Sequence, residues 1–183
     1  MAAPRGTLFL VVGPSGAGKD TLIDGAKAAL AGDPRYAFPR RVVTRAPSAG
    51  EDHRPMSVEE FQAAETRGEF ALAWSAHGLH YGIPHAIDDA LAQGRHVIVN
   101  VSRAVIPEAR RRYRPLRIVE VTAPVDVLAE RLARRGRENA VEIAERLRRS
   151  GAIPVEGPDV TRIETTGTIE ESVRALLAAL GTA

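Results

Sequence analysis

The chain has 183 residues, with 25 Lys and Arg against 23 Asp and Glu, and no Cys. This length predicts a single domain whose core needs no covalent staple. The lack of Cys excludes disulfides, thiolate metal sites and a thiol nucleophile. The first apolar run, Leu8–Val12, is too short for a membrane span or a signal peptide. We therefore expect a cytoplasmic protein that does not enter a membrane.

Apolar runs rich in β-branched residues alternate with helical patterns along the chain. Ser57 and Glu60 form a capping-box pattern at the start of one helix, and Pro84 suits the first position of another. In chain order, the expected strands are Thr7–Val12, Arg41–Thr44, Phe70–Ser75, Leu79–Gly82, His96–Val101, Arg117–Thr122 and Thr161–Thr165. The expected helices are Asp20–Ala31, Ser57–Arg67, Pro84–Gln93, Ala104–Tyr113, Val125–Arg135, Asn139–Ser150 and Ile169–Leu180.

Long apolar strands that alternate with helices predict a parallel sheet covered on both faces. We therefore expect an α/β fold with three α/β/α layers, formed by residues 1–183 as one domain. Residues 35–92 break the alternation of strands and helices. This segment is expected to form an inserted subdomain.

The sharpest motif is a glycine-rich loop between the first strand and the first helix. It reads Gly13-Pro14-Ser15-Gly16-Ala17-Gly18-Lys19-Asp20-Thr21. In this context, backbone N–H groups converge on phosphate oxygens at a helix N-terminus, and Lys19 reaches the β- and γ-phosphates. The usual motif has Ser or Thr after the Lys as a ligand of Mg²⁺, and here Asp20 takes that place. We expect Asp20 to hold Mg²⁺ directly or through water, and Thr21 to reach a phosphate.

Beyond this loop, the order and spacing of several segments resemble the guanylate kinase family of P-loop phosphotransferases. The matching segments are Thr44–Glu51, Ser57–Phe61, Gly68–Phe70, His77–Gly82, Arg131–Gly136 and Arg146-Leu147. The resemblance covers almost the whole chain. It implies an acceptor-binding insert over 35–92 and a helical lid over 131–150 that closes over ATP.

The same resemblance implies roles for individual residues. Lys19, Arg131 and Arg146 are expected to act as catalytic cations around the transferred phosphoryl group. Arg131 and Arg135 are also expected to bind ATP, together with the loop. Arg45 and Tyr81 are expected to bind the acceptor phosphate.

The positions that read the base depart from the guanylate kinase pattern. The family places an acidic residue two positions after Gly-Glu-Phe, where this chain has Leu72, and a second acid where it has Ser102. A site that leaves the donor edge of a purine without an acceptor is strongly penalised. We therefore expect Leu72 and Ser102 to lie at the acceptor site, and GMP not to be the acceptor.

Three features resemble the ribose 1,5-bisphosphate phosphokinases of phosphonate catabolism, a guanylate-kinase-like group: Gly18-Lys19-Asp20, Thr44-Arg45 with a shortened segment up to Ser57, and Ala76–Pro84. This resemblance implies phosphoryl transfer from ATP to the 1-phosphate of ribose 1,5-bisphosphate. The products are then ADP and 5-phosphoribosyl 1-diphosphate (PRPP). His77 and His80 are expected to line the bisphosphate pocket with Tyr81 and Arg146.

Three other functions stay open at this point: a guanylate or other nucleoside monophosphate kinase, a guanylate-kinase-like binding module without catalysis, and a nucleic-acid-binding protein. Lys19 argues against the binding module, which has no need to hold a γ-phosphate. A net charge of +2 and few aromatic residues argue against nucleic acid as a partner. The expected partners are small molecules, and the sequence leaves a homodimer open.

Overall fold

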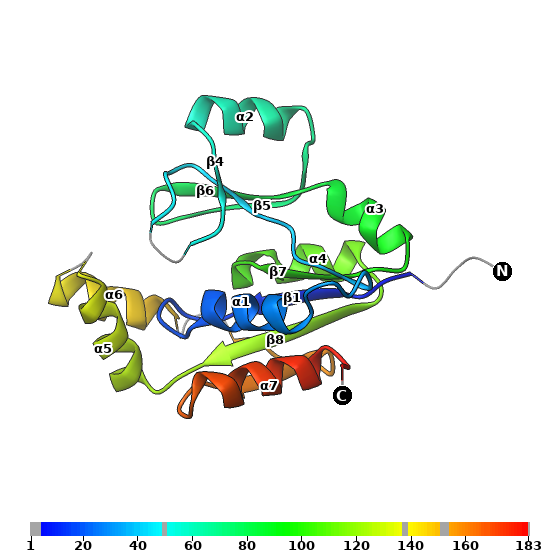
Figure 1. The fold of residues 1–183 in the computed structure, drawn as a ribbon. Coiled ribbons are helices and arrows are strands. Elements are labelled where there is room, and N and C mark those ends of the chain that lie inside the picture. Colours follow the sequence, from blue (N-terminus) through cyan, green and yellow to red (C-terminus); the bar gives the residue numbers. More distant parts are fainter. Residues whose placement is uncertain (1–4, 49–50, 137–138, 151–153, 183) are drawn as a thin grey trace. The chain divides into compact units, whose positions relative to one another are not determined.

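The computed structural model of the chain describes residues 5–48, 51–136, 139–150 and 154–182. The strands are Leu8–Val12 (β1), Tyr36–Ala37 (β2), Val42–Val43 (β3), Arg54–Pro55 (β4), Phe70–Ala76 (β5), Leu79–Pro84 (β6), His96–Asn100 (β7), Leu116–Thr122 (β8) and Val160–Glu164 (β9). The helices are Lys19–Ala29 (α1), Val58–Thr66 (α2), Ala86–Ala92 (α3), Ile106–Arg112 (α4), Val125–Arg135 (α5), Ala140–Ser150 (α6) and Ile169–Ala179 (α7), with a 3₁₀ turn at Arg103–Val105 (η1). Figure 1 shows the arrangement of these elements along the chain.

The strands form two sheets. One has the order β2-β7-β1-β8-β9, and the other has the order β4-β3-β6-β5. In the first sheet, β2 pairs with β7 and β8 pairs with β9, both in parallel. Every residue of β1 is buried, which agrees with its unbroken apolar sequence because strands inside a parallel sheet are covered on both faces. The predicted α/β fold with a parallel sheet is confirmed.

The second sheet is mixed. Strand β6 runs antiparallel to both β3 and β5, whereas β3 and β4 are parallel. All of its strands lie within residues 35–92, the segment in which we expected an insert. The same segment also contains β2, which belongs to the parallel sheet.

The contacts divide the chain into two compact units. The first unit holds Leu30–Arg117 with the chain up to Leu10, and the second holds Val11–Ala29 with the chain from Ile118 on. Within the second unit, α1 packs against α7. A Cβ on Gly25 of α1 would lie 2.4 Å from a methyl carbon of Val173, so only glycine permits this close approach of the two helices.

Two local signals in the sequence had different outcomes. The capping box is confirmed, because the Glu60 N–H donates to Ser57 Oγ at 3.1 Å and the Ser57 N–H donates to Glu60 Oε2 at 2.8 Å. The expectation that Pro84 begins a helix was wrong. Pro84 ends β6, and α3 begins at Ala86. A proline at the end of a strand costs the sheet little, because the ladder needs no N–H there.

None of the helices in the described ranges is long and apolar enough to cross a membrane.

Candidate functional site

The glycine-rich loop of the second unit follows β1 and leads into α1. Gly13, Gly16 and Gly18 have φ values of 147°, 88° and 90°, which side chains of other residues rarely tolerate. At Gly13, a Cβ would lie 2.1 Å from the carbonyl oxygen of Val121. The glycines therefore allow a backbone path that other residues would block, as the phosphate-loop motif predicts.

Lys19 is the first residue of α1 and bends back over the loop. Its Nζ donates to Gly13 O at 2.8 Å and to Pro14 O at 2.9 Å. These bonds hold the ammonium group at the start of the loop, and its predicted contact with the β- and γ-phosphates stays a prediction. Asp20 is half-buried and Thr21 is exposed in the next two positions of the helix.

Arg131 of α5 and Thr165 join the loop to the rest of the second unit. Arg131 Nη1 donates to Gly16 O at 3.2 Å and to Thr165 Oγ1 at 2.9 Å, and Nη2 donates to Thr165 O at 2.8 Å. Thr165 is 5% exposed, and its Oγ1 lies 2.9 Å from Ala17 O and 3.1 Å from Thr122 O. The Thr165 hydroxyl therefore links two sequence-distant carbonyls and a guanidinium at one point.

A pocket of about 290 Å³ opens beside this junction. It is lined by Gly16, Ala17, Gly18, Thr21, Leu22, Arg131, Arg134, Thr165, Gly167, Thr168, Ile169 and Ser172. The sequence analysis singled out the loop residues and Arg131. It missed Thr165 and the segment 167–169, because no motif marks them and their partners lie far away along the chain.

Replacing Thr165 by Val is expected to destabilise the second unit and weaken nucleotide binding, because Ala17 O and Arg131 Nη1 both lose a buried partner. The loss costs about 1–3 kcal/mol of unfolding free energy and lowers the Tm by roughly 2–12 °C. Thermal unfolding and the KM for ATP measure the two effects. Thr165→Ser keeps the hydroxyl and should retain most of both properties. A Val variant with an unchanged Tm and KM for ATP would remove Thr165 from this role.

Arg45 of the first unit lies just after β3 and is held by a carboxylate. Its Nη1 and Nη2 donate to Glu51 Oε2 at 2.7 Å and to Glu51 Oε1 at 2.9 Å. The backbone N–H of Ser48 donates to the same carboxylate at 3.2 Å. Such a bidentate pair fixes the plane of the guanidinium.

His53 supports Arg45 from inside the unit. The His53 side chain is 1% exposed, and its Nε2 donates to Arg45 O at 3.0 Å, since a carbonyl oxygen can only accept. Its Nδ1 lies 3.9 Å from Glu51 Oε2. The sequence analysis predicted Arg45 as a ligand but did not predict this support by Glu51 and His53.

Tyr81 and His80 lie on opposite faces of the mixed sheet, because neighbouring residues of a strand point in opposite directions. The Tyr81 ring stacks on Trp74, with ring centroids 5.2 Å apart. The His80 ring stacks on Phe61 of α2 at 5.4 Å, and its Nδ1 lies 2.8 Å from Ser75 Oγ. His80 is therefore part of the packing under α2, on the face of the sheet opposite to Tyr81, and the roles of both residues at the acceptor stay predictions.

Three other residues that the sequence places at the acceptor lie in a turn, at a helix cap and in the core. His77 is exposed and forms with Gly78 the two-residue turn between β5 and β6, where both residues have positive φ (53° and 73°). Ser102 Oγ accepts from the Ala104 N–H at 3.2 Å and so caps η1. Leu72 is 1% exposed and belongs to the core. This burial does not favour the expected contact between Leu72 and the acceptor, which stays a prediction.

The side chains of Arg135 and Arg146 lie outside what the structure describes. Their predicted roles at ATP and at the transferred phosphoryl group stay predictions.

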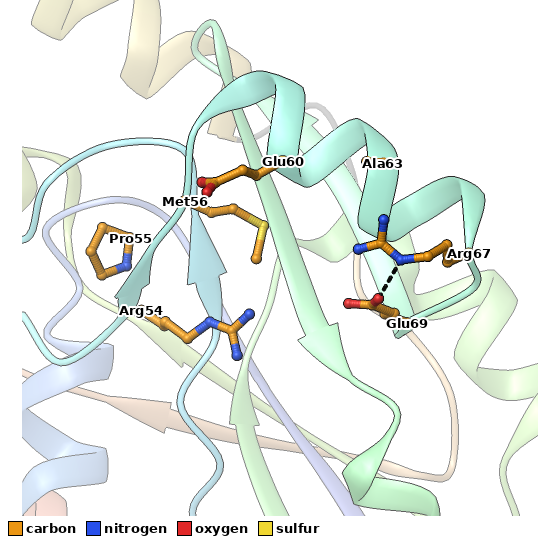
Figure 2. A pocket seen from close by; sticks show the side chains of 7 residues that line it. All are labelled: Arg54, Pro55, Met56, Glu60, Ala63, Arg67 and Glu69. Atoms are coloured by element: carbon orange, nitrogen blue, oxygen red, sulfur yellow. Dashed lines mark hydrogen bonds and ion pairs between the residues drawn. The ribbon is translucent and has the colours of Figure 1, made fainter.

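Figure 2 shows a second pocket of about 390 Å³ in the first unit. It is lined by Arg54, Pro55, Met56, Glu60, Ala63, Arg67 and Glu69. Both of its carboxylates are engaged, since Glu60 accepts from the Ser57 N–H and Glu69 pairs with Arg67 Nε at 2.6 Å. Two arginines and two glutamates balance in charge and favour no class of ligand, so this pocket adds nothing to the candidate site.

Comparison with known proteins identifies the family of the chain. The sequence matches the model of the guanylate kinase family over residues 5–178. The chain belongs to the guanylate kinase family. The resemblance seen in the motifs is therefore confirmed.

Relatives within the guanylate kinase family are similar over most of the chain. A protein of Acidiphilium cryptum named ribose 1,5-bisphosphate phosphokinase PhnN is 56% identical over 164 residues, which cover 89% of this chain and 87% of that protein. A protein of the same name from Methylobacterium radiotolerans is 49% identical over 175 residues, covering 96% and 97% of the two chains. The crystal structure of guanylate kinase from Anaplasma phagocytophilum matches the fold with a TM-score of 0.71 at 19% identity, covering 100% of this chain and 88% of that one.

Proposed function

We propose that this chain transfers the γ-phosphoryl group of ATP to the 1-phosphate of ribose 1,5-bisphosphate, forming PRPP and ADP. The observation that carries the proposal is 49–56% identity, over almost the whole chain, to proteins named for this activity. The phosphate loop with Lys19 supports a nucleoside triphosphate as donor. The absence of an acidic residue at Leu72 and Ser102 supports an acceptor without guanine.

The donor is proposed to bind at the loop of the second unit, with its phosphates over Gly13–Gly18 and its base in the pocket beside Thr165. Lys19 and the N-terminal end of α1 then face the phosphates with positive charge. Arg131, docked on Gly16 O, adds a second cation near the loop. We keep Arg135 and Arg146 as further ligands of the phosphates.

Mg²⁺ bound to a nucleotide takes most of its ligands from phosphates and water, and one or two from carboxylates. In the described part of the chain, no group of three or more His, Asp or Glu side chains is arranged to hold a metal ion. Asp20 in the first turn of α1 fits as the single carboxylate, either directly or through water. The ion, when bound, neutralises charge that develops on the β- and γ-phosphate oxygens.

The acceptor phosphate needs no general base. The second pKa of a phosphate monoester is about 6, so its oxygen is already ionised at neutral pH. This oxygen forms the new bond to the γ-phosphorus, and the bond from the γ-phosphorus to the bridging oxygen of ADP breaks. The protein's task is to bring two polyanions together, for which Arg45, oriented by Glu51, is the proposed acceptor ligand.

The test is ADP release from MgATP with ribose 1,5-bisphosphate or GMP as acceptor, measured side by side. We expect turnover with the bisphosphate and little with GMP. A preference for GMP would instead identify a guanylate kinase. This is the second candidate, because the family model that matches the chain is that of guanylate kinases. ATP binding without turnover of either acceptor would contradict both kinase activities and favour a binding module.

A further inference from the structure

His53 is the least exposed of the buried polar side chains in the described part of the chain, with 1% of its surface accessible. From this ring, two further side chains lead outward to the surface of the first unit. The side chain of Glu51 is 14% exposed, and that of Arg45 is 30% exposed. The proposed acceptor ligand is thus connected through a carboxylate to an imidazole in the core.

The hydrogen bond to Arg45 O determines which ring nitrogen of His53 carries the proton. Because Nε2 donates this bond at 3.0 Å, Nε2 is protonated, and Nδ1 of the neutral imidazole is then an acceptor with a lone pair. Among the described residues, Nδ1 has no hydrogen-bond partner. It lies 3.9 Å from Glu51 Oε2, which is too far for a hydrogen bond. The nitrogen nearest to Glu51 is therefore an acceptor and not a donor.

An acceptor nitrogen in this place keeps the Glu51 carboxylate on Arg45. A carboxylate can only accept, so it forms no hydrogen bond with an unprotonated Nδ1. Its two oxygens instead accept from the two terminal nitrogens of the Arg45 guanidinium, at 2.7 and 2.9 Å. With the proton on Nδ1, the ring would compete with Arg45 for Glu51 Oε2. The backbone carbonyl of Arg45 thus sets the tautomer that reserves the carboxylate for the Arg45 side chain.

A second arginine fixes the backbone of His53. Arg40 Nη2 donates to His53 O at 3.0 Å, and Arg40 Nε lies 2.6 Å from Asp52 Oδ1. The pairing of β3 with β4 begins at the next residue, where the Arg54 N–H donates to Arg41 O at 2.9 Å. His53 is therefore held both at its backbone and at its ring, as a residue that orients another one must be.

We propose that His53 is a positioning residue for Arg45: its tautomer directs Glu51 onto the guanidinium and so holds Arg45 in the orientation that binds the acceptor. The inference rests on the proposed function, in which Arg45 is a ligand of the acceptor, and adds to it a residue that touches no substrate. Because His53 is buried, it acts only through Arg45 and Glu51.

Two neutral amides separate the roles of the two ring nitrogens. The amide nitrogen of His53→Gln can take the place of Nε2 and donate to Arg45 O, whereas the shorter His53→Asn has its N–H near the place of Nδ1, where it competes for Glu51. We expect His53→Asn to raise the KM for ribose 1,5-bisphosphate about tenfold and to leave the KM for ATP within about twofold of wild type. His53→Gln should restore most of the acceptor affinity. His85→Gln changes an exposed histidine of the same unit and should leave both KM values unchanged.

A double-mutant cycle tests whether His53 acts through Arg45. Arg45→Ala removes the guanidinium that His53 is proposed to orient. Adding His53→Asn to Arg45→Ala should therefore raise the acceptor KM by less than about twofold. A further tenfold rise would show that His53 affects the acceptor without Arg45, and would contradict the positioning role.

Nitrogen NMR gives a readout that does not depend on turnover. The chain has five histidines, and in protein labelled with ¹⁵N-histidine the signals of His53 are those that His53→Gln removes. In mildly alkaline buffer they should show a protonated Nε2 and an unprotonated Nδ1. Titration with ribose 5-phosphate should shift them and saturate, because a phosphate on Arg45 alters the pair with Glu51. Ribose without phosphate should leave them unchanged.

The outcomes separate this inference from the proposed function. If ribose 1,5-bisphosphate is turned over but His53→Asn leaves the acceptor KM unchanged, His53 does not position Arg45 and the function stands. If the bisphosphate is not turned over, the proposed function is wrong, and the NMR spectra decide on His53. A proton on Nδ1, or signals that ribose 5-phosphate does not shift, would overturn the inference. Should His53→Asn fail to fold, the spectra of the wild-type protein decide in the same way.

Discussion

Replacing Lys19 by Ala is expected to lower kcat about a thousandfold, because removal of one preorganised cation from a phosphoryl-transfer site has effects of this size. The two carbonyl bonds of Lys19, to Gly13 and Pro14, place the ammonium group at the loop rather than in the core. The substitution should therefore leave the Tm close to that of the wild-type protein. ADP release at saturating acceptor measures the loss.

The chain provides its own control for this experiment. Lys27 is its other lysine, exposed in the last turn of the same helix α1. Lys27→Ala removes the same charge from α1 without touching the loop, and its kcat should stay within about twofold of wild type. If Lys19→Ala kept more than about a tenth of the wild-type kcat, the loop would not contribute as an electrostatic catalyst.

Replacing Leu72 by Glu is expected to destabilise the protein by about 4 kcal/mol or more, which lowers the Tm by roughly 8 °C or more. Leu72 is 1% exposed, so the change removes buried apolar surface and also places a carboxylate where water does not reach. Thermal unfolding measures the effect. Leu72→Met conserves volume and should cost less than about 1.5 kcal/mol.

The same substitution decides between two interpretations of this position. From the sequence alone, Leu72 stands where a base-reading acid is expected, and a Glu there would admit GMP. In the structure the position lies in the core. A Leu72→Glu protein with a wild-type Tm and new activity toward GMP would show that residue 72 reaches the acceptor after all.

The glycine-rich loop could be predicted because the residues that indicate it are neighbours in the sequence. A buried strand, glycines at fixed spacing and a lysine at the start of a helix are all contiguous in the sequence. In the structure, the ends of β1 and α1 lie within two residues of the expected ones. The capping box at Ser57 is local in the same way. Thr165 could not be predicted, because its contact with Ala17 spans 148 residues and depends on how distant segments pack.

The residues that the sequence places at the acceptor site show a different limit of prediction. The alternation of His80 and Tyr81 across the sheet was available from the sequence, since adjacent residues of an expected strand point to opposite faces. The burial of Leu72 could not be predicted from the sequence. Its strand is apolar at consecutive positions, so the pattern does not tell which face is buried. The stack of Trp74 on Tyr81 depends on the register between β5 and β6. The turn at His77-Gly78 sets this register, and the sequence alone does not give the length and type of that turn.

The hydrogen bond from Thr165 to Ala17 also determines when, during synthesis of the chain, the pocket beside the loop can form. Ala17 leaves the ribosome early, but its partner is synthesised 148 residues later. At a translation rate of about 5–20 residues per second, roughly 7–30 s pass between the synthesis of Ala17 and that of Thr165. Nascent chains that stop short of Thr165 therefore lack the finished pocket beside the loop, and the donor site that we propose is complete only when synthesis is nearly over.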